Sequence, residues 1–239
     1  MPGKPIPLSM QTIQTIIEAV IIDLDGTMID TAPDFLLAVN RMRDDLHLAP
    51  LTIEHIKRMV GKGSEHLIRQ VLAEDYDTAE TEAHFAQALD AYQRHYQDIN
   101  GSQSELYPGV LEGLQAMQAL GLRLACVTNK PTAFAIALME QKGLASYFAL
   151  TFGGDAFPRK KPDPMPLLQV CTRFDLPPSR VLAIGDSSND AQAAHAAGCP
   201  VLNVPYGYNH GEPVQNIESD GIVGSLLEAA DWISGKLNH

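Results

Sequence analysis

Two carboxylates two residues apart stand near the start of the chain, in residues 23–27 (DLDGT). Acids at the spacing of Asp23 and Asp25 can supply a nucleophile, a proton donor and ligands for a hard cation. Gly26 permits the sharp turn that would hold both acids at the end of a strand. The pair alone is weak evidence for a catalytic site, because most acid pairs of this kind are solvated loop residues.

Three further polar clusters follow, at residues 128–130 (TNK), 160–164 (KKPDP) and 185–190 (GDSSND). The first offers a hydroxyl, an amide and backbone N–H groups near a helix start, which suit phosphate oxygens. The second carries basic residues in an otherwise acidic chain, and the third carries acids that can reach a cation. Taken singly, each also fits a plain structural role as a helix cap or a solvated surface charge.

All four clusters follow segments that the sequence predicts to be strands. Short apolar runs rich in β-branched residues predict buried parallel strands at 19–24, 122–127, 149–152, 180–184 and 200–204. Segments with helical apolar spacing separate most of them, at 110–120, 131–142, 165–174 and 189–197. This alternation predicts an α/β fold with a doubly wound, mostly parallel sheet. Ligands bind such sheets at the carboxyl ends of the strands, where the clusters fall.

The stretch between the first and second clusters breaks the α/β pattern. It is charged, lacks a convincing strand and predicts helices at 33–46, 52–59, 64–73 and 78–97. A turn is expected at Gly61-Lys62-Gly63. We therefore expect an α/β catalytic core of residues 1–30 and 105–239, with an inserted all-α helical cap of residues 31–104.

The composition narrows the range of partners. A formal net charge of −12 argues against nucleic-acid binding, which needs clustered lysines and arginines on one face. The same negative field would repel an anionic substrate, so a phosphate-binding site in this chain needs local cations or a metal. No nucleic acid and no membrane are expected as partners, and a monomer or weak homodimer is expected.

The cysteines and the N-terminal residues indicate in which cellular compartment the protein acts. Cys126, Cys171 and Cys199 are odd in number and far apart, which favours a reducing cytoplasm over a disulfide framework. The apolar segment 13–24 contains two acids, so neither a membrane span nor a signal peptide is predicted. Residues 1–11, with three prolines, are expected to be a loose leader.

In their order and combination, the four clusters resemble the four motifs of the haloacid dehalogenase superfamily. The resemblance runs from Ala19 to the last predicted helix near Trp232, and the helical insert is similar to that superfamily's cap of the first type. Within the superfamily the chain most resembles the phosphoglycolate phosphatases, in the segments DLDGT, VTNK, GGDAFPRKKPDP and GDSSND and in the cap segment VGKG. The resemblance implies a Rossmann-like core.

The resemblance also implies roles for the first pair of acids. Asp23 would be the nucleophile that forms an aspartyl phosphate, which splits one hard displacement into two easier ones. Asp25 would be the general acid and base, protonating the leaving alkoxide and then deprotonating the attacking water. Dehalogenases proper usually lack this second acid, so its presence favours phosphate chemistry.

The remaining clusters take roles around the phosphate and the metal. The resemblance implies that Thr128 and Asn129 hold the phosphoryl oxygens, while Lys161 neutralises charge among the carboxylates. Lys161 is chosen over Lys160 because the lysine of the family motif directly precedes proline.

The resemblance further implies a magnesium ion at the first and fourth clusters. Mg²⁺ would be held by Asp23, the Asp25 backbone carbonyl and Asp186. Asp190 and Asn189 would lie next to these ligands without binding the ion, and Asp190 would orient the site.

The sequence thus predicts a Mg²⁺-dependent phosphomonoester hydrolase acting on a small phosphorylated metabolite, with 2-phosphoglycolate as the preferred candidate. Lys62 and Gly63 of the cap turn are predicted to lie near the leaving group, where Lys62 could bind a carboxylate. A sugar phosphomutase of the β-phosphoglucomutase type stays open, as do phosphatases for pyrophosphate, nucleotides or sugar phosphates. A non-enzymatic receiver-like phospho-acceptor is disfavoured, because such a module has no cause to carry a helical cap.

Overall fold

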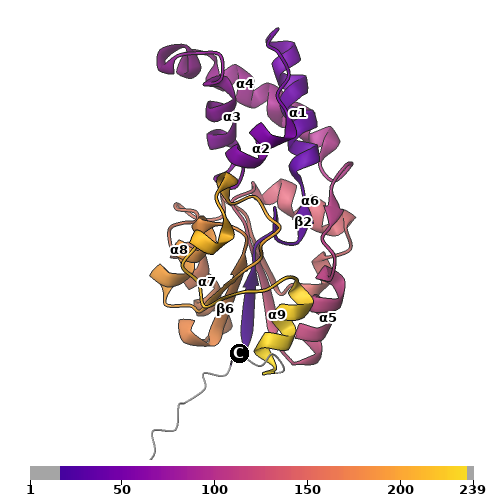
Figure 1. Ribbon diagram of the computed structural model, residues 1–239, viewed down its shortest axis with the longest axis vertical. Helices are drawn as coiled ribbons and strands as arrows, with labels where there is room; N and C mark the ends of the chain where they lie inside the picture. Colours follow the sequence, from indigo (N-terminus) through magenta and orange to yellow (C-terminus); the bar gives the residue numbers. More distant parts are fainter. Residues whose placement is uncertain (1–16, 236–239) are drawn as a thin grey trace, which may run out of the picture.

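A six-stranded parallel sheet forms the lower part of the molecule in the computed structural model, which describes residues 17–235 (Figure 1). The strand order is β5-β4-β1-β6-β7-β8. The strands are β1 (Ala19–Ile22), β4 (Arg123–Val127), β5 (Leu150–Phe152), β6 (Val181–Gly185), β7 (Val201–Asn203) and β8 (Gly221–Ile222). Every residue of β1 is buried, as expected for a central strand of a parallel sheet. The predicted leader, residues 1–11, lies outside the described residues.

Helices cover both faces of the sheet. Alternate residues of the central strand β1 point to opposite faces, so each face has apolar side chains for helices to bury. Val20 and Ile22 pack with residues of α5 (Val110–Ala119), α6 (Thr132–Gln141) and α9 (Leu226–Ile233). Ala19 and Ile21 pack with residues of α7 (Met165–Phe174) and α8 (Ser188–Ala197). Figure 1 shows α7 and α8 on one side of the sheet and α5 and α9 on the other. The predicted doubly wound α/β fold is confirmed.

Four helices form a second group at the upper end of the molecule (Figure 1). They are α1 (Ala32–Asp45), α2 (Ile53–Met59), α3 (Ser64–Leu72) and α4 (Thr78–Ile99). Their apolar side chains pack into a hydrophobic cluster of their own, with α1 against α4 and α3 against α4. Throughout this article we call residues 31–104 the cap.

Short elements connect these parts. The antiparallel strands β2 (Ile29–Asp30) and β3 (Glu105–Leu106) pair where the chain enters and leaves the cap. The single-turn helices are η1 (Ala145–Tyr147), η2 (Pro178–Arg180), η3 (Asn209–Gly211) and η4 (Val214–Asn216). Within residues 17–235, no helix has the length and apolar character needed to cross a bilayer.

The side chain of Asp34 ties the start of the cap to its end. It is fully buried in the first turn of α1. Its carboxylate accepts hydrogen bonds from the backbone N–H groups of Gly101 and Gln103, both at 2.7 Å, and from the hydroxyls of Ser102 and Ser104. One carboxylate therefore holds the two connections between cap and sheet together.

Replacing Asp34 with alanine is expected to lower the free energy of unfolding by about 3 kcal/mol, because buried donors lose a charged acceptor. For a chain of this size, that loss corresponds to a melting temperature roughly 6 to 12 °C lower. Thermal unfolding followed by circular dichroism measures the effect. Asp44→Ala, at an exposed position of the same helix, is the matched control. Equal melting temperatures for the two variants would refute the role of Asp34.

Candidate active site

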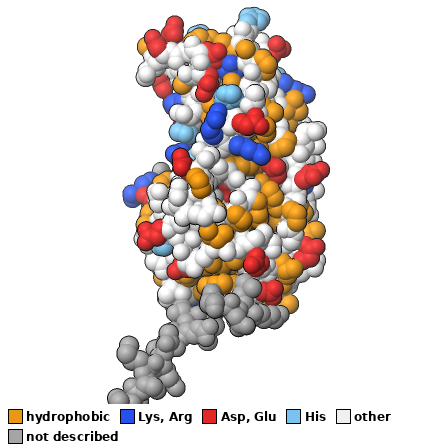
Figure 2. Space-filling model, viewed as in Figure 1, with side chains coloured by type: hydrophobic (Ala, Val, Ile, Leu, Met, Phe, Trp, Pro, Cys, Tyr) orange, Lys and Arg blue, Asp and Glu red, His pale blue; other side chains and the backbone are white. Residues whose placement is uncertain are grey.

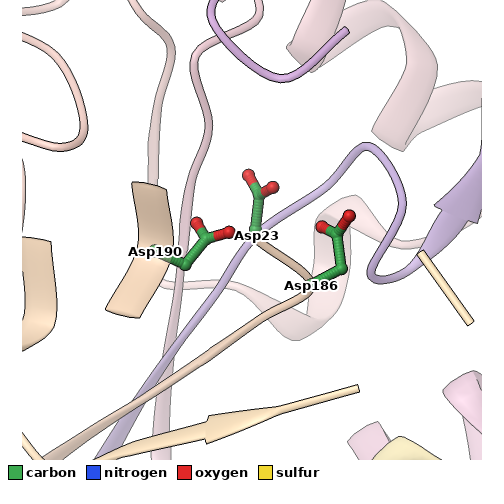
Figure 3. Close-up of side chains that lie close together, drawn as sticks. All are labelled: Asp23, Asp186 and Asp190. Atoms are coloured by element: carbon green, nitrogen blue, oxygen red, sulfur yellow. The ribbon is translucent and has the colours of Figure 1, made fainter. Parts of the chain in front are cut away.

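The sheet brings the four polar clusters together at the carboxyl ends of adjacent strands. Because β1 lies between β4 and β6, Asp23 after β1 stands beside Thr128 after β4 and Asp186 after β6. Lys161 reaches the same place from the loop between β5 and α7. Figure 3 shows the carboxylates of Asp23, Asp186 and Asp190 close together, with Asp23 and Asp186 just after β1 and β6 and Asp190 in α8.

These three acids are close enough to share one cation. Ligand atoms of Asp23, Asp186 and Asp190 all lie within 4.8 Å of one another. Asp186 is oriented by the Thr27 hydroxyl at 2.9 Å and by the backbone N–H of Tyr208 at 2.8 Å. A side chain at Gly26 would begin 2.5 Å from a carboxylate oxygen of Asp186, so only glycine lets the chain pass here.

Lys161 neutralises part of this negative charge. Its Nζ lies 2.9 Å from Asp23 Oδ1 and 2.6 Å from Asp190 Oδ1, and it donates to the backbone carbonyl of Val127 at 2.7 Å. Burial alone would disfavour the charged lysine, but Asp190 and Asp23 together raise the pKa of Lys161 above its usual value. The adjacent Lys160 instead places its Nζ close to Gly63 of the cap.

One buried lysine does not balance three buried acids. Burial raises the pKa of Asp23 to about 8, and the Asp190 and Asp186 carboxylates add to this against the lowering effect of Lys161. Burial and the Asp190 charge raise the pKa of Asp186 to about 7. A divalent cation would restore the charged forms, and carboxylate oxygens are ligands that Mg²⁺ prefers. The residues present therefore fit a magnesium ion.

Asp190 contacts Lys161 through one carboxylate oxygen. Its second oxygen accepts from the backbone N–H of Ser187 at 3.1 Å and from the Ser187 hydroxyl at 2.6 Å, which closes a capping box at the start of α8. The helix start therefore holds the carboxylate that orients Lys161.

Backbone N–H groups next to Asp23 are available to an anion. In the described part of the chain, the N–H groups of Leu24, Asp25 and Asn129 donate to no acceptor. Thr128, which is buried, lines the same cavity as Asp23 and Asp25. Unpaired N–H groups that converge at strand ends are typical of phosphate sites.

The side chain of Asn129 is engaged elsewhere. Its Nδ2 donates to the backbone carbonyls of Gly61 at 3.0 Å and Lys161 at 2.8 Å. Nδ2 of Asn189 reaches the same Gly61 carbonyl at 3.4 Å. These two amides hold the cap turn against the sheet, which leaves the backbone N–H of Asn129 as its free donor toward a phosphate.

A cavity lies between the strand ends and the cap. Asp23, Asp25, Thr128 and Lys130 line it on the sheet side. The cap side is mainly apolar and aromatic, with Phe35, Val60, Leu67, Tyr92 and Tyr96. The cap therefore closes the space in which a leaving group would lie.

The two cap residues predicted to lie near the leaving group, Lys62 and Gly63, line different spaces. Gly63 lines the cavity, whereas Lys62 lines a more open cleft with Lys160, His66 and Arg69, which Lys161 also borders. Burial and the three neighbouring cations lower the pKa of His66. Figure 2 shows lysine, arginine and histidine side chains gathered where the cap meets the sheet. Lys62 thus belongs to the outer cleft.

Sequence reasoning gave Lys130 no role of its own, yet the structure places it in the centre of the site. Its Nζ lies 2.9 Å from Asp25 Oδ1 and donates to the Tyr96 hydroxyl at 2.6 Å. Its side chain is only 1% exposed. The one signal in the sequence is its position directly after Thr128 and Asn129.

Comparisons with known proteins agree with this geometry. The model of the haloacid dehalogenase-like hydrolase family matches residues 20–204. The chain is 47% identical over 214 residues to a phosphoglycolate phosphatase of Thiobacillus denitrificans, covering 90% of this chain and 94% of that one. It is 48% identical over 217 residues to a phosphoglycolate phosphatase of Nitrosospira multiformis, covering 91% and 96%.

A solved structure has the same fold over nearly the same length. The crystal structure of a predicted phosphoglycolate phosphatase from Haemophilus somnus superposes with a TM-score of 0.85 at 32% identity, covering 92% of this chain and 98% of that one. The family match spans the cap as well as the segments that carry the acids and Lys161. On this evidence the chain belongs to the haloacid dehalogenase-like hydrolase family.

Proposed function

We propose that this chain is a Mg²⁺-dependent phosphatase that hydrolyses 2-phosphoglycolate to glycolate and phosphate. The observation that carries the proposal is that Asp23 and Asp25 line one cavity between the sheet and the cap, with Asp186, Asp190 and Lys161 clustered around Asp23. The names of the two curated relatives support the choice of phosphoglycolate.

The proposed reaction proceeds in two displacements at phosphorus. A carboxylate oxygen of Asp23 attacks the phosphorus atom, the bond to the leaving oxygen breaks, and Asp25 gives its proton to the departing alkoxide. Water then attacks the aspartyl phosphate, Asp25 takes the proton of that water, and phosphate leaves as the Asp23 carboxylate is restored. Asp25 thus acts first as an acid and then as a base.

The other site residues handle charge and position. Asp23, Asp186 and the backbone carbonyl of Asp25 would hold the magnesium ion, which when bound neutralises charge on the transferring phosphoryl group. Lys161 keeps Asp23 beside the phosphorus and contributes a second positive charge. Thr128 and the backbone N–H of Asn129 bind phosphoryl oxygens.

Residues 31–104 act in this proposal as a cap that excludes water during the first displacement. Asn129 and Asn189 hold the cap turn through the Gly61 carbonyl, which gives Asn189 a positioning role. The structure brings Cys171 and Cys199 together, with Sγ atoms 4.0 Å apart, and both are free thiols, which supports action in a reducing cytoplasm.

Phosphate release from a panel of phosphorylated metabolites tests the proposal. Because the cap wall of the cavity is mainly apolar and Lys130 is the one cation among its described lining residues, 2-phosphoglycolate is expected to show a kcat/KM at least about tenfold above sugar phosphates, nucleotides and pyrophosphate. A higher kcat/KM for any of these would reject phosphoglycolate as the substrate. Conversion of glucose 1-phosphate to glucose 6-phosphate without phosphate release would instead identify a phosphomutase.

A further inference from the structure

Lys130 carries a buried ammonium group with donor capacity left over. Its Nζ contacts Asp25 Oδ1 at 2.9 Å and Tyr96 Oη at 2.6 Å. It also lies 4.4 Å from the ring centroid of Phe35 and 4.8 Å from that of Tyr96. An ammonium has three hydrogens to donate, and these two oxygens are its only acceptors among residues 17–235. One further acceptor can therefore be bound.

The surroundings of Lys130 favour an anion as that acceptor. Among the described residues that line the cavity, Lys130 is the only cation. Lys161 already has three oxygen partners, and Lys62 lines the outer cleft. Helix α3 begins at Ser64, which lines the cavity, so the positive end of its dipole lies at the same wall.

A charged leaving group needs such a partner. An anion that enters a cavity with an apolar and aromatic cap wall loses part of its hydration, and this cost is offset by a paired charge or hydrogen bonds. The leaving oxygen must lie within hydrogen-bonding distance of Asp25 to receive its proton. In 2-phosphoglycolate the carboxyl carbon is two bonds from that oxygen, so the carboxylate falls beside the ammonium that contacts Asp25.

We propose that Lys130 determines substrate specificity by binding the carboxylate of the leaving group. This inference rests on the proposed phosphatase function and extends it, because it selects small phosphate monoesters whose leaving group carries a negative charge. It assigns to Lys130 the recognition that the sequence alone suggested for Lys62. Because Tyr96 belongs to the cap, this recognition depends on the packing of the cap against the sheet.

The experiment compares 2-phosphoglycolate with its amide, in which a neutral carboxamide replaces the carboxylate at nearly constant size. The readout is the ratio of kcat/KM for the two substrates, since damage to steps that both share cancels. Lys130→Met and Lys130→Gln are expected to reduce the preference for the acid about ten- to a hundredfold. Glutamine is polar but uncharged, so it tests the charge even if methionine disturbs folding.

Two other lysine variants complete the design. Lys57→Met removes an exposed cap lysine and is expected to leave the ratio unchanged. Lys62→Met tests the outer cleft directly. The proposal is overturned if the preference disappears in Lys62→Met while Lys130→Gln keeps it. It is also overturned if the Lys130 variants slow both substrates equally, because Lys130 would then only position Asp25.

Failure of the underlying function gives a different result. If the unaltered protein with Mg²⁺ hydrolyses neither the acid nor the amide, the phosphatase assignment for phosphoglycolate fails, and the role of Lys130 fails with it. If the unaltered protein hydrolyses both and the Lys130 variants keep the original ratio, only the specificity proposal fails.

Discussion

Replacement of Asp23 with asparagine is expected to reduce kcat by at least ~10⁴-fold. Asparagine has nearly the same size, but its amide cannot attack phosphorus to form the acyl phosphate. The fold is expected to persist, because the change removes one of three crowded carboxylates and relieves repulsion from Asp190 and Asp186. Steady-state phosphate release, with circular dichroism of the purified variant, measures both properties. Retained turnover in folded protein would show that Asp23 is not the nucleophile.

Asp25→Asn is the matched control for this experiment. The side chain of Asp25 contacts Lys130, and only its backbone carbonyl is proposed as a metal ligand. The variant should therefore keep its affinity for Mg²⁺ and lose kcat. With p-nitrophenyl phosphate, whose leaving group needs no proton, it should accumulate protein heavier by one phosphoryl group. Equal losses of Mg²⁺ affinity in Asp23→Asn and Asp25→Asn would contradict this division of roles.

Removal of divalent cations is expected to abolish turnover completely, and added Mg²⁺ is expected to restore it. Without a cation, three buried carboxylates face one lysine, and an arriving phosphate would add negative charge to the same place. Ca²⁺ should inhibit, because its larger radius and irregular coordination disturb the alignment that phosphoryl transfer needs. The measurement is phosphate release after chelation, followed by titration with each cation.

A binding readout independent of turnover accompanies this prediction. Mg²⁺ should raise the melting temperature of the unaltered protein, since a ligand that binds only the folded state stabilises it. Asp186→Asn should remove this shift, whereas Asp44→Ala on the cap surface should retain it. Full turnover after exhaustive chelation would exclude a metal-dependent reaction.

The fold could be predicted from the sequence where local patterns are strong. The buried strands are short apolar runs, whereas the helices between them have apolar residues at helical spacing. Strands and helices can therefore be told apart. Strands β2, β3 and β8 have two residues each, which is too short for any period to show. Their pairing depends on tertiary contacts.

The candidate site could be predicted only as far as it follows strand ends. Asp23, Thr128 and Asp186 each lie at or just after the end of a predicted strand, so the topology of a parallel sheet brings them together. The position of Lys130 depends on Tyr96, which the cap supplies from a distant part of the chain. How the cap packs on the sheet, and hence which lysine faces the cavity, is not encoded in any local pattern.

The position along the chain of the strands that flank β1 affects how the protein folds during its synthesis. Val20 in β1 pairs with Leu124 and Leu182, and both partners follow the whole cap in the chain. A ribosome adds roughly 5–20 residues per second, whereas helical units with local contacts fold in milliseconds or less. The apolar first strand therefore emerges seconds before either neighbour exists, while the cap helices can already be folded. During that interval the nascent chain exposes a strand with two open edges, which is the state that chaperones protect from aggregation.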